Sequence, residues 1–318
     1  VFNRFLSKML ISKNASKTLS EAISSQEKTY CSGLFLSARW FVVSQVAESG
    51  THVIIMPDKE SAEYCSADLY SLVEGDRVFF LPDSGKNVER SNYKSSLGVQ
   101  RTSAVGSILA NAANASLLYV VTYPEALEEP IPGKAKIAGA ALVLKKDEEM
   151  GRDHIVSTLL SQNFARVDFV SAPGQFAVRG AVIDIFSYSN NDPFRISFFG
   201  DEIEKINVFD CNTQLSKEER ESVEIFPDII ASDTESEDGM SILEILPENT
   251  VVWLDSSDMY KGKNFFSSLE KFHRVFLEIP LSEQGVEPIK FSITPQPVFN
   301  KNFELLSEDI RTRMEHGF

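Results

Sequence analysis

The sequence predicts an α/β domain interrupted by a smaller α+β domain, and three observations lead to this prediction. Over residues 1–126, short apolar runs alternate with amphipathic segments, which is typical of parallel βαβ units. Over 127–215, apolar runs follow one another with short connections, as antiparallel strands do. Over 216–318 the first pattern returns. We therefore expect a first half, an inserted domain and a second half with these boundaries, the two halves together completing the α/β domain.

The first half shows strand and helix signals in turn. "HVIIMPD" (52–58) and "RVFFLPD" (77–83) are apolar runs that end in Pro-Asp turns, and "SLLYVVTYPEAL" (116–127) is a third such run. Each predicts a buried strand. Apolar residues at helical spacing follow the first run, and "SSLGVQRTSAVGSILANAA" (95–113) predicts a second helix.

The inserted segment opens with one strand signal and one helix signal. "AALVLKKDE" (140–148) predicts the strand, and "RDHIVSTLLSQNF" (152–164) predicts the helix. Three closely spaced β runs follow, at Gln175–Tyr188, Pro193–Phe199 and Glu202–Asp210. Gly200 and Asp201 suit a two-residue hairpin turn between the last two runs. Antiparallel strands beside a helix make a separate α+β domain.

The second half offers further strands for the α/β sheet. They are "VEIFPDI" (223–229), "NTVVWLDSSD" (249–258) and "FHRVFLEIP" (272–280). The first two flank a short helical segment, so we expect another βαβ contribution there. No internal repeat is present at the periods of 20–50 residues that mark solenoids.

Composition excludes several classes of protein. A net charge of −15 and a pI of about 4.8 count against an autonomous nucleic-acid binder, which neutralises phosphates with Lys and Arg. Acidity fits either a basic protein partner or solubility alone. Three distant cysteines support neither a disulfide framework nor a zinc site, so we expect the reducing cytoplasm. No apolar run reaches the roughly 18 residues that span a membrane.

The segment "GLFLSARW" (33–40) lies where a phosphate-binding loop would lead into a helix. Such a loop needs glycines whose N–H groups wrap the phosphates, a Lys for the β- and γ-phosphates, and a hydroxyl for Mg²⁺. Gly33 is present, but Ala38 replaces the second glycine, Arg39 the lysine and Trp40 the Ser or Thr. We predict that no ATP is hydrolysed here; weak anion binding at the helix start stays open.

A metal-holding acid at the end of a buried strand would complete such a site. "VVWLDSSD" ends its apolar run at Asp255, but Ser256 stands where a catalytic Glu would follow. The predicted inactive nucleotide site therefore consists of Gly33, Ser37, Arg39 and Asp255. Four scattered histidines and the absence of nucleophile or metal-ligand motifs predict neither a catalytic residue nor a metal site.

Alternation along "FRISFFG" (194–200) separates two faces of a strand. Phe194, Ile196 and Phe198 share one face, a candidate core face, and Arg195, Ser197 and Phe199 share the other. Arg beside an aromatic residue is the composition of a binding hot spot. Alternatively, the arginines of this region pair with local acids such as Asp184 or Glu202 and Phe199 covers a helix of its own domain. Because Gly180 permits a bulge, alternation does not decide the face of Arg179.

The segment "GQFAVRGAVIDIFSYSNNDPFRISFFGDEIEKINVFD" (174–210) closely resembles the module shared by the excision-repair protein UvrB and the bacterial transcription-repair coupling factors (Mfd). The core R-G-x-[VL]-[IL]-D-[IL]-F, followed by R-[IL]-x-F-F-[GD]-D-E-I, is long and specific. The similarity extends more weakly over most of the chain. "GLFLSARW" resembles the degraded phosphate loop of the coupling factors rather than the intact loop of UvrB.

The resemblance implies a degenerate RecA-like, P-loop NTPase-type domain in two sequence halves, with the small α+β domain inserted between them. It also implies that the inserted domain binds UvrA, the damage-sensing ATPase of nucleotide excision repair, and so recruits repair to stalled RNA polymerase. The family's contact residues, two arginines and a phenylalanine, fall on Arg179, Arg195 and Phe199. Alternation points independently to the last two, whereas the resemblance alone brings in Arg179.

Other parts of the coupling factors have no counterpart in this sequence. Their polymerase-binding domain and their ATP- and Mg-dependent DNA translocase motor are missing, as is the damage-probing hairpin of UvrB. We therefore expect an N-terminal, non-catalytic fragment that needs no cofactor itself, while RNA polymerase and DNA are contacted by other domains of the full-length protein. Two alternatives remain: a nucleotide-binding RecA-like domain, or an autoinhibitory lid whose recruitment face is masked by the C-terminal region of the full-length protein.

Overall fold

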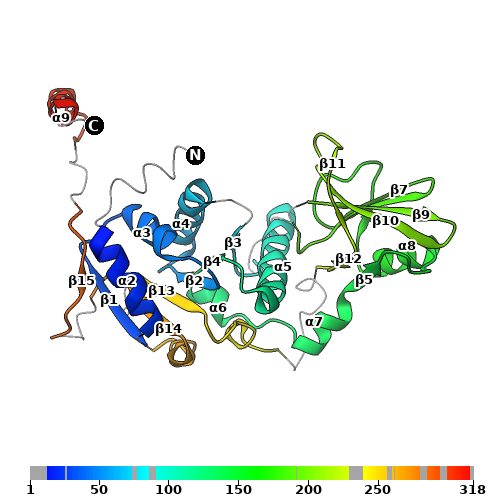
Figure 1. Ribbon diagram of the computed structural model, residues 1–318, viewed down its shortest axis with the longest axis horizontal. Coiled ribbons are helices and arrows are strands. Elements are labelled where there is room, and N and C mark those ends of the chain that lie inside the picture. The colour runs from blue at the N-terminus through cyan, green and yellow to red at the C-terminus, as the bar shows by residue number, and fades with distance from the viewer. Residues whose placement is uncertain are drawn as a thin grey trace.

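Two sheets of different type organise the described part of the chain. The computed structural model describes residues 13–25, 27–73, 77–85, 91–190, 192–228, 239–255, 260, 262–279, 285–293 and 299–315. Figure 1 shows a parallel sheet on the left and a largely antiparallel sheet on the right. The mixed α/β class predicted from the sequence is therefore confirmed.

The parallel sheet has seven strands in the order β15-β1-β14-β13-β2-β4-β3. Every neighbouring pair in it is parallel. Its strands are β1 (Lys28–Ser32), β2 (Thr51–Ile55), β3 (Val78–Phe80), β4 (Leu118–Thr122), β13 (Val251–Leu254), β14 (His273–Phe276) and β15 (Ile289–Lys290). Strands from before and after the smaller sheet thus lie side by side, with β13 paired to β2.

Helices cover both faces of the parallel sheet. The α-helices of this region are α2 (Lys13–Ser25), α3 (Ala38–Val46), α4 (Lys59–Leu72), α5 (Ser91–Asn114) and α6 (Pro124–Glu128), with short 3-10 turns η2 (Ile242–Glu244) and η4 (Ser267–Lys271). One core joins the sheet to α2, α3 and α4, and the other joins it to α5 and both 3-10 turns. Successive residues of β2 enter different cores, so the whole strand is buried and reads as a continuous apolar run.

Two buried polar side chains tie loops of this domain together. Arg101 of α5 is fully buried and donates hydrogen bonds to the carbonyl oxygens of Pro82, Ala126 and Glu129. His52 of β2 accepts a hydrogen bond at Nδ1 from the indole N–H of Trp253. These side chains are structural, because the hydrogen bonds that they make go to groups of the fold itself, although the buried Nε of Arg101 has no acceptor.

The smaller sheet has six strands in the order β11-β10-β9-β8-β7-β6. They are β6 (Ala165–Arg166), β7 (Gln175–Arg179), β8 (Val182–Phe186), β9 (Phe194–Phe199), β10 (Glu202–Phe209) and β11 (Ser216–Arg220). Only β6 and β7 pair in parallel; the other pairs are antiparallel. α8 (Arg152–Ser161) and the two-stranded sheet of β5 (Leu142–Lys145) and β12 (Ser222–Ile225) share a core with one face. α7 (Lys134–Ala140) precedes them, and α9 (Phe303–Glu315) ends the described chain.

Two strand predictions are wrong. The run Gln175–Tyr188 is not one strand, because Gly180, with a φ of 60°, and Ala181 form a tight turn between β7 and β8. A Gly in the left-handed region makes such a turn without steric cost. "VEIFPDI" does not extend the parallel sheet, since β12 pairs antiparallel with β5. β11 follows residue 215 and pairs with β10; the boundaries predicted between domains stay predictions.

Candidate partner-binding site

Gly33 lies at a crowded point of the backbone rather than at an open loop. Its φ is 77°, and a Cβ there would meet the carbonyl oxygen of Phe291 at 2.0 Å. The amide of Phe291 donates to the carbonyl of Ser32 at 2.8 Å, so the chain beside β15 packs directly on this glycine. The packing of two backbone segments accounts for Gly33 without any phosphate.

Arg39, which stands at the lysine position of the loop, is held by acids of the chain. Its guanidinium donates to Asp255 and, at 2.9 Å, to Glu278, and only 16% of its side chain is exposed. Ser37 donates to Asp68 at 2.6 Å. Three of the four residues of the predicted nucleotide site thus make protein contacts that a phosphate or Mg²⁺ would have to displace. Ser256, which stands where a catalytic Glu would follow Asp255, falls outside the described residues.

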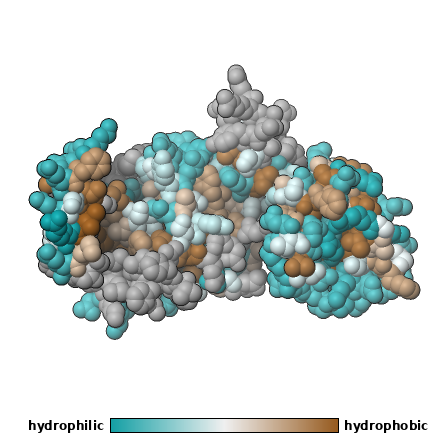
Figure 2. All heavy atoms as spheres, turned by 90° about the horizontal axis from the view of Figure 1, so that it is seen from above, coloured by the Kyte–Doolittle hydropathy of each residue, from teal (hydrophilic) through white to brown (hydrophobic). Residues whose placement is uncertain are grey.

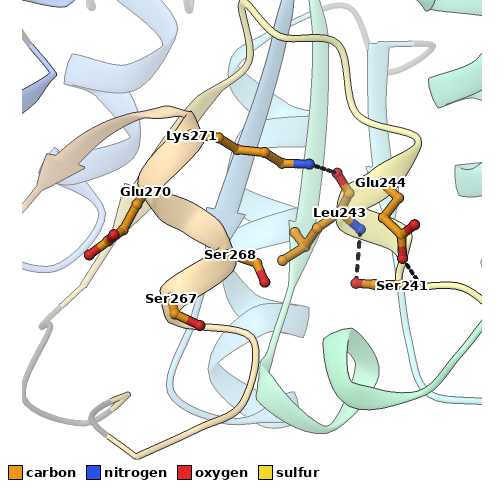
Figure 3. A pocket seen from close by; sticks show the side chains of 7 residues that line it. All are labelled: Ser241, Leu243, Glu244, Ser267, Ser268, Glu270 and Lys271. Atoms are coloured by element: carbon orange, nitrogen blue, oxygen red, sulfur yellow. Dashed lines mark hydrogen bonds between the residues drawn. The ribbon is translucent and has the colours of Figure 1, made fainter.

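A pocket of about 450 Å³ lies elsewhere, beside the two 3-10 turns (Figure 3). It is lined by Ser241, Leu243, Glu244, Ser267, Ser268, Glu270 and Lys271. The ammonium of Lys271 already donates to the carbonyl of Leu243 at 2.9 Å. No residue predicted as a site lines this pocket. Among the described residues, no three metal-ligating side chains gather.

In the smaller sheet, Asp184 brings Arg179 and Arg195 together. Asp184 of β8 is opposite Ala177 on β7 and Arg195 on β9, and its side chain is fully buried. Arg195 donates from Nε to Oδ1 at 2.7 Å and from Nη2 to Oδ2 at 3.0 Å. Arg179 Nη2 donates to the same Oδ2. One buried carboxylate therefore accepts from both arginines.

Arg195 is also enclosed by other groups. Its Nη2 donates to the side-chain oxygen of Gln214 at 2.9 Å, and its guanidinium lies 4.2 Å from the ring centroid of Phe209. The hydrogen bond to Asp184 raises the pKa of the Arg195 guanidinium above its usual range. Arg195 is therefore a permanent cation with a fixed orientation, 22% exposed.

Arg179 lies on the same face but closer to solvent. It is the last residue of β7, and 38% of its side chain is exposed. Its guanidinium lies 5.0 Å from the ring centroid of Phe169, within the range of a cation–π interaction. Phe169 is itself 63% exposed. The structure thus places Arg179 beside Arg195, which sequence alternation alone left undecided.

Phe199 ends β9 with its side chain 78% exposed. The burial of β9 alternates as predicted, with Phe194, Ile196 and Phe198 buried and Arg195 and Ser197 on the more exposed face. The Gly200–Asp201 hairpin is also confirmed, since Phe199 pairs with Glu202. Half of the alternative explanation is correct, because both arginines pair with Asp184. The other half, in which Phe199 is buried against a helix, does not fit a side chain that is 78% exposed.

Arg179 and Phe199 lie toward one end of the smaller sheet, at the ends of β7 and β9, and Arg195 lies four residues before Phe199 on β9. The β7–β8 and β9–β10 turns are adjacent there, since the amide of Phe198 donates to the carbonyl of Ala181. Apolar patches interrupt the hydrophilic surface of this lobe, on the right of Figure 2. We use the name arginine patch for Phe169, Arg179, Asp184, Arg195 and Phe199. Sequence reasoning missed Phe169, because the surrounding segment "RVDFV" (166–170) carries no motif. It considered Asp184 only as a local acid that could pair with the arginines.

The residues of the smaller sheet match a known protein family. Residues 142–229 match the family model described as the UvrB interaction domain. Residues 142–229 are therefore similar to the UvrB interaction domain. All six strands of the smaller sheet and the whole arginine patch fall inside the matched residues.

Proteins similar in sequence to this chain have names that fit this match. The transcription-repair-coupling factor of Escherichia coli K12 is 39% identical over 89 residues, 28% of this chain and 8% of that protein. The transcription-repair-coupling factor of Bacillus subtilis 168 is 28% identical over 198 residues, which are 61% of this chain and 16% of that protein. UvrABC system protein B of Chlorobium phaeobacteroides is 35% identical over 127 residues, which are 40% of this chain and 18% of that protein. The similarity covers less than a fifth of each relative, and it confirms the predicted resemblance to the UvrB-homology module of coupling factors.

Proposed function

We propose that this chain is a non-catalytic platform that binds UvrA through its UvrB interaction domain. The observation that carries the proposal is the arginine patch, in which a buried carboxylate fixes two cations on the sheet face that also carries the exposed Phe199. Preformed Arg and aromatic side chains are the usual anchors of a protein interface, and fixed guanidinium groups recognise carboxylates. In a transcription-repair coupling factor this platform would bring nucleotide excision repair, in the cytoplasm, to stalled RNA polymerase.

The parallel sheet is, in this proposal, a degenerate RecA-like domain in two sequence halves that needs no nucleotide or metal. The pairing of β13 with β2 supports one domain made from both ends of the described chain. The ion pairs of Arg39 support an inactive nucleotide site. DNA, RNA polymerase and ATP with Mg²⁺ would be handled by other domains of a full-length coupling factor, which would also mask the patch until it is needed. No described helix is long and apolar enough to cross a membrane.

Replacing any of three patch residues by Ala should weaken UvrA binding. Arg179→Ala, Arg195→Ala and Phe199→Ala should each cost at least about 1 kcal/mol, a fivefold or larger rise in Kd, because each removes a hot-spot side chain. The measurement is a titration of this chain with purified UvrA. Tyr64→Ala, an exposed aromatic on α4, is the matched control and should bind as wild type does. Unchanged affinity for all three patch variants would sink the proposal.

MgATP should leave the thermal unfolding of this chain unchanged. A ligand that binds only the folded state raises the unfolding temperature, and the guanidinium of Arg39 is already paired with Asp255 and Glu278. The measurement compares unfolding temperatures with and without millimolar MgATP, in wild type and in Arg39→Ala. A rise in wild type that the variant lacks would contradict the proposal and favour a nucleotide-binding domain.

A further inference from the structure

The two arginines of the arginine patch differ in how many of their donors are already used. Arg195 donates from Nε and Nη2 to Asp184, from Nη2 to the side-chain oxygen of Gln214, and from Nη1 to the carbonyl of Gln214 at 3.4 Å. A guanidinium has five N–H donors, so four of the five have acceptors within the protein. Arg195 has little left to offer a partner.

Arg179, in contrast, uses few of its N–H donors within the protein. Within the described part of the chain, its hydrogen bonding is confined to the one bond from Nη2 to Asp184. Four of its five N–H donors, on Nε, on Nη1 and the second one on Nη2, therefore keep no acceptor in this part of the chain. The remaining Nη2 hydrogen lies parallel to one on Nε or Nη1, so one edge with two donors stays available, on a side chain that is more exposed than that of Arg195. The ring of Phe169 supports the guanidinium from one side.

We propose that Arg179 and Phe169 together make the contact to a carboxylate of the partner, and that Asp184 is a positioning residue that holds Arg179 in place for it. Arg195 then acts through Asp184. Arg195 donates two hydrogen bonds to Asp184 and is itself held by Gln214, so it fixes the carboxylate to which Arg179 is bonded. This inference rests on the proposed function, in which the partner is UvrA. It adds Phe169 and Asp184 to the site and assigns the direct ionic contact to Arg179.

The chemistry selects an acidic side chain as the group recognised. A guanidinium edge with two parallel N–H donors matches a carboxylate, and both members of such a pair are charged. Asp184 lowers the rotational freedom of Arg179 before binding, so less entropy is lost when the partner arrives. Two cations and one buried anion also leave the cluster with a net positive charge, in a chain that carries −15 overall.

The test is a UvrA titration with Phe169→Ala, Asp184→Asn and Arg179→Ala, and with the double variant Asp184→Asn/Arg179→Ala. We expect Phe169→Ala and Asp184→Asn each to raise Kd about five- to tenfold, as hot-spot losses do. Asp184→Asn should add nothing in the Arg179→Ala background, because its effect passes through Arg179. A merely structural loss at Asp184 would instead raise Kd equally in both backgrounds, and that result overturns the positioning role.

Failure of the inference and failure of the proposed function give different results. Wild-type affinity for Phe169→Ala, with Arg179→Ala and Phe199→Ala still weakened, overturns the extended contact and leaves the UvrA platform standing. Wild-type affinity for Arg179→Ala, Arg195→Ala and Phe199→Ala as well would overturn the proposed binding of UvrA itself. If Asp184→Asn does not fold, Gln214→Ala loosens Arg195 without touching the buried carboxylate, and it should weaken binding less than Phe169→Ala does. Equal affinity of Gln214→Ala and wild type then counts against positioning.

Discussion

Arg101→Met is expected to lower the free energy of unfolding of the parallel-sheet domain by about 3 kcal/mol, since buried charged networks that lose one partner typically lose this much. Met fills a similar volume but donates no hydrogen bond. The carbonyl oxygens of Pro82, Ala126 and Glu129 would then be left without their donor in the interior. Part of this loss is offset, because burial disfavours the charged guanidinium and lowers the pKa of Arg101.

Tryptophan fluorescence during urea unfolding isolates this effect. The chain has two tryptophans, Trp40 on α3 and Trp253 on β13, both buried in the core shared with the parallel sheet. The fluorescence change therefore reports that domain and not the smaller sheet. Arg311→Met, at an exposed position of α9, is the matched control and should unfold as wild type does. Identical midpoints for the two variants would show that the buried network contributes little.

Acidification from pH 8 to pH 5 should destabilise the same domain through His52, by roughly 2 kcal/mol. Burial lowers the pKa of His52 from 6.5 to about 4. In the unfolded chain His52 takes up a proton below its ordinary pKa of 6.5, whereas in the folded chain it stays neutral until about pH 4. The unfolded state thus binds more protons in this window, so stability is complete above pH 6.5 and falls as the pH drops toward 4.

Carboxylates titrate in the same range, so the useful quantity is a difference between proteins. His52→Gln removes the titrating group and keeps a polar side chain beside Trp253. Its free energy of unfolding should fall less than that of wild type between pH 8 and pH 5. His154→Gln, at an exposed position of α8, is the control and should follow wild type throughout. Parallel pH curves for wild type and His52→Gln would disprove the buried neutral histidine.

Sequence patterns predicted the elements whose burial is periodic or continuous. β2, β4 and β13 are buried along their whole length, and such strands stand out as apolar runs. The turn at Gly180 was missed because the segments on its two sides are apolar except at Arg179 and Asp184, and nothing local shows that the chain reverses. β12 was assigned to the wrong sheet because pairing between distant segments leaves no local signal.

The candidate site was predictable to a similar extent. Alternation along β9 placed Arg195 and Phe199 on one face, and the structure agrees. The face of Arg179 depends on the β7–β8 register, and the role of Asp184 depends on three strands meeting at one buried carboxylate. Phe169 lies in a loop and reaches the patch through space alone. Contacts between strands, and not the residues singly, define this site.

A ribosome makes β1 and β2 long before it makes β13 and β14, the strands that lie between them in the sheet. Until residues 251–276 have been synthesised, β1 has no partner on either side in the described sheet, since β15 comes later still. All six strands of the smaller sheet lie within 165–220. Domains fold as units while the chain emerges, so we expect the nascent protein to form the arginine patch while the strands of the larger sheet are still unpaired at their edges.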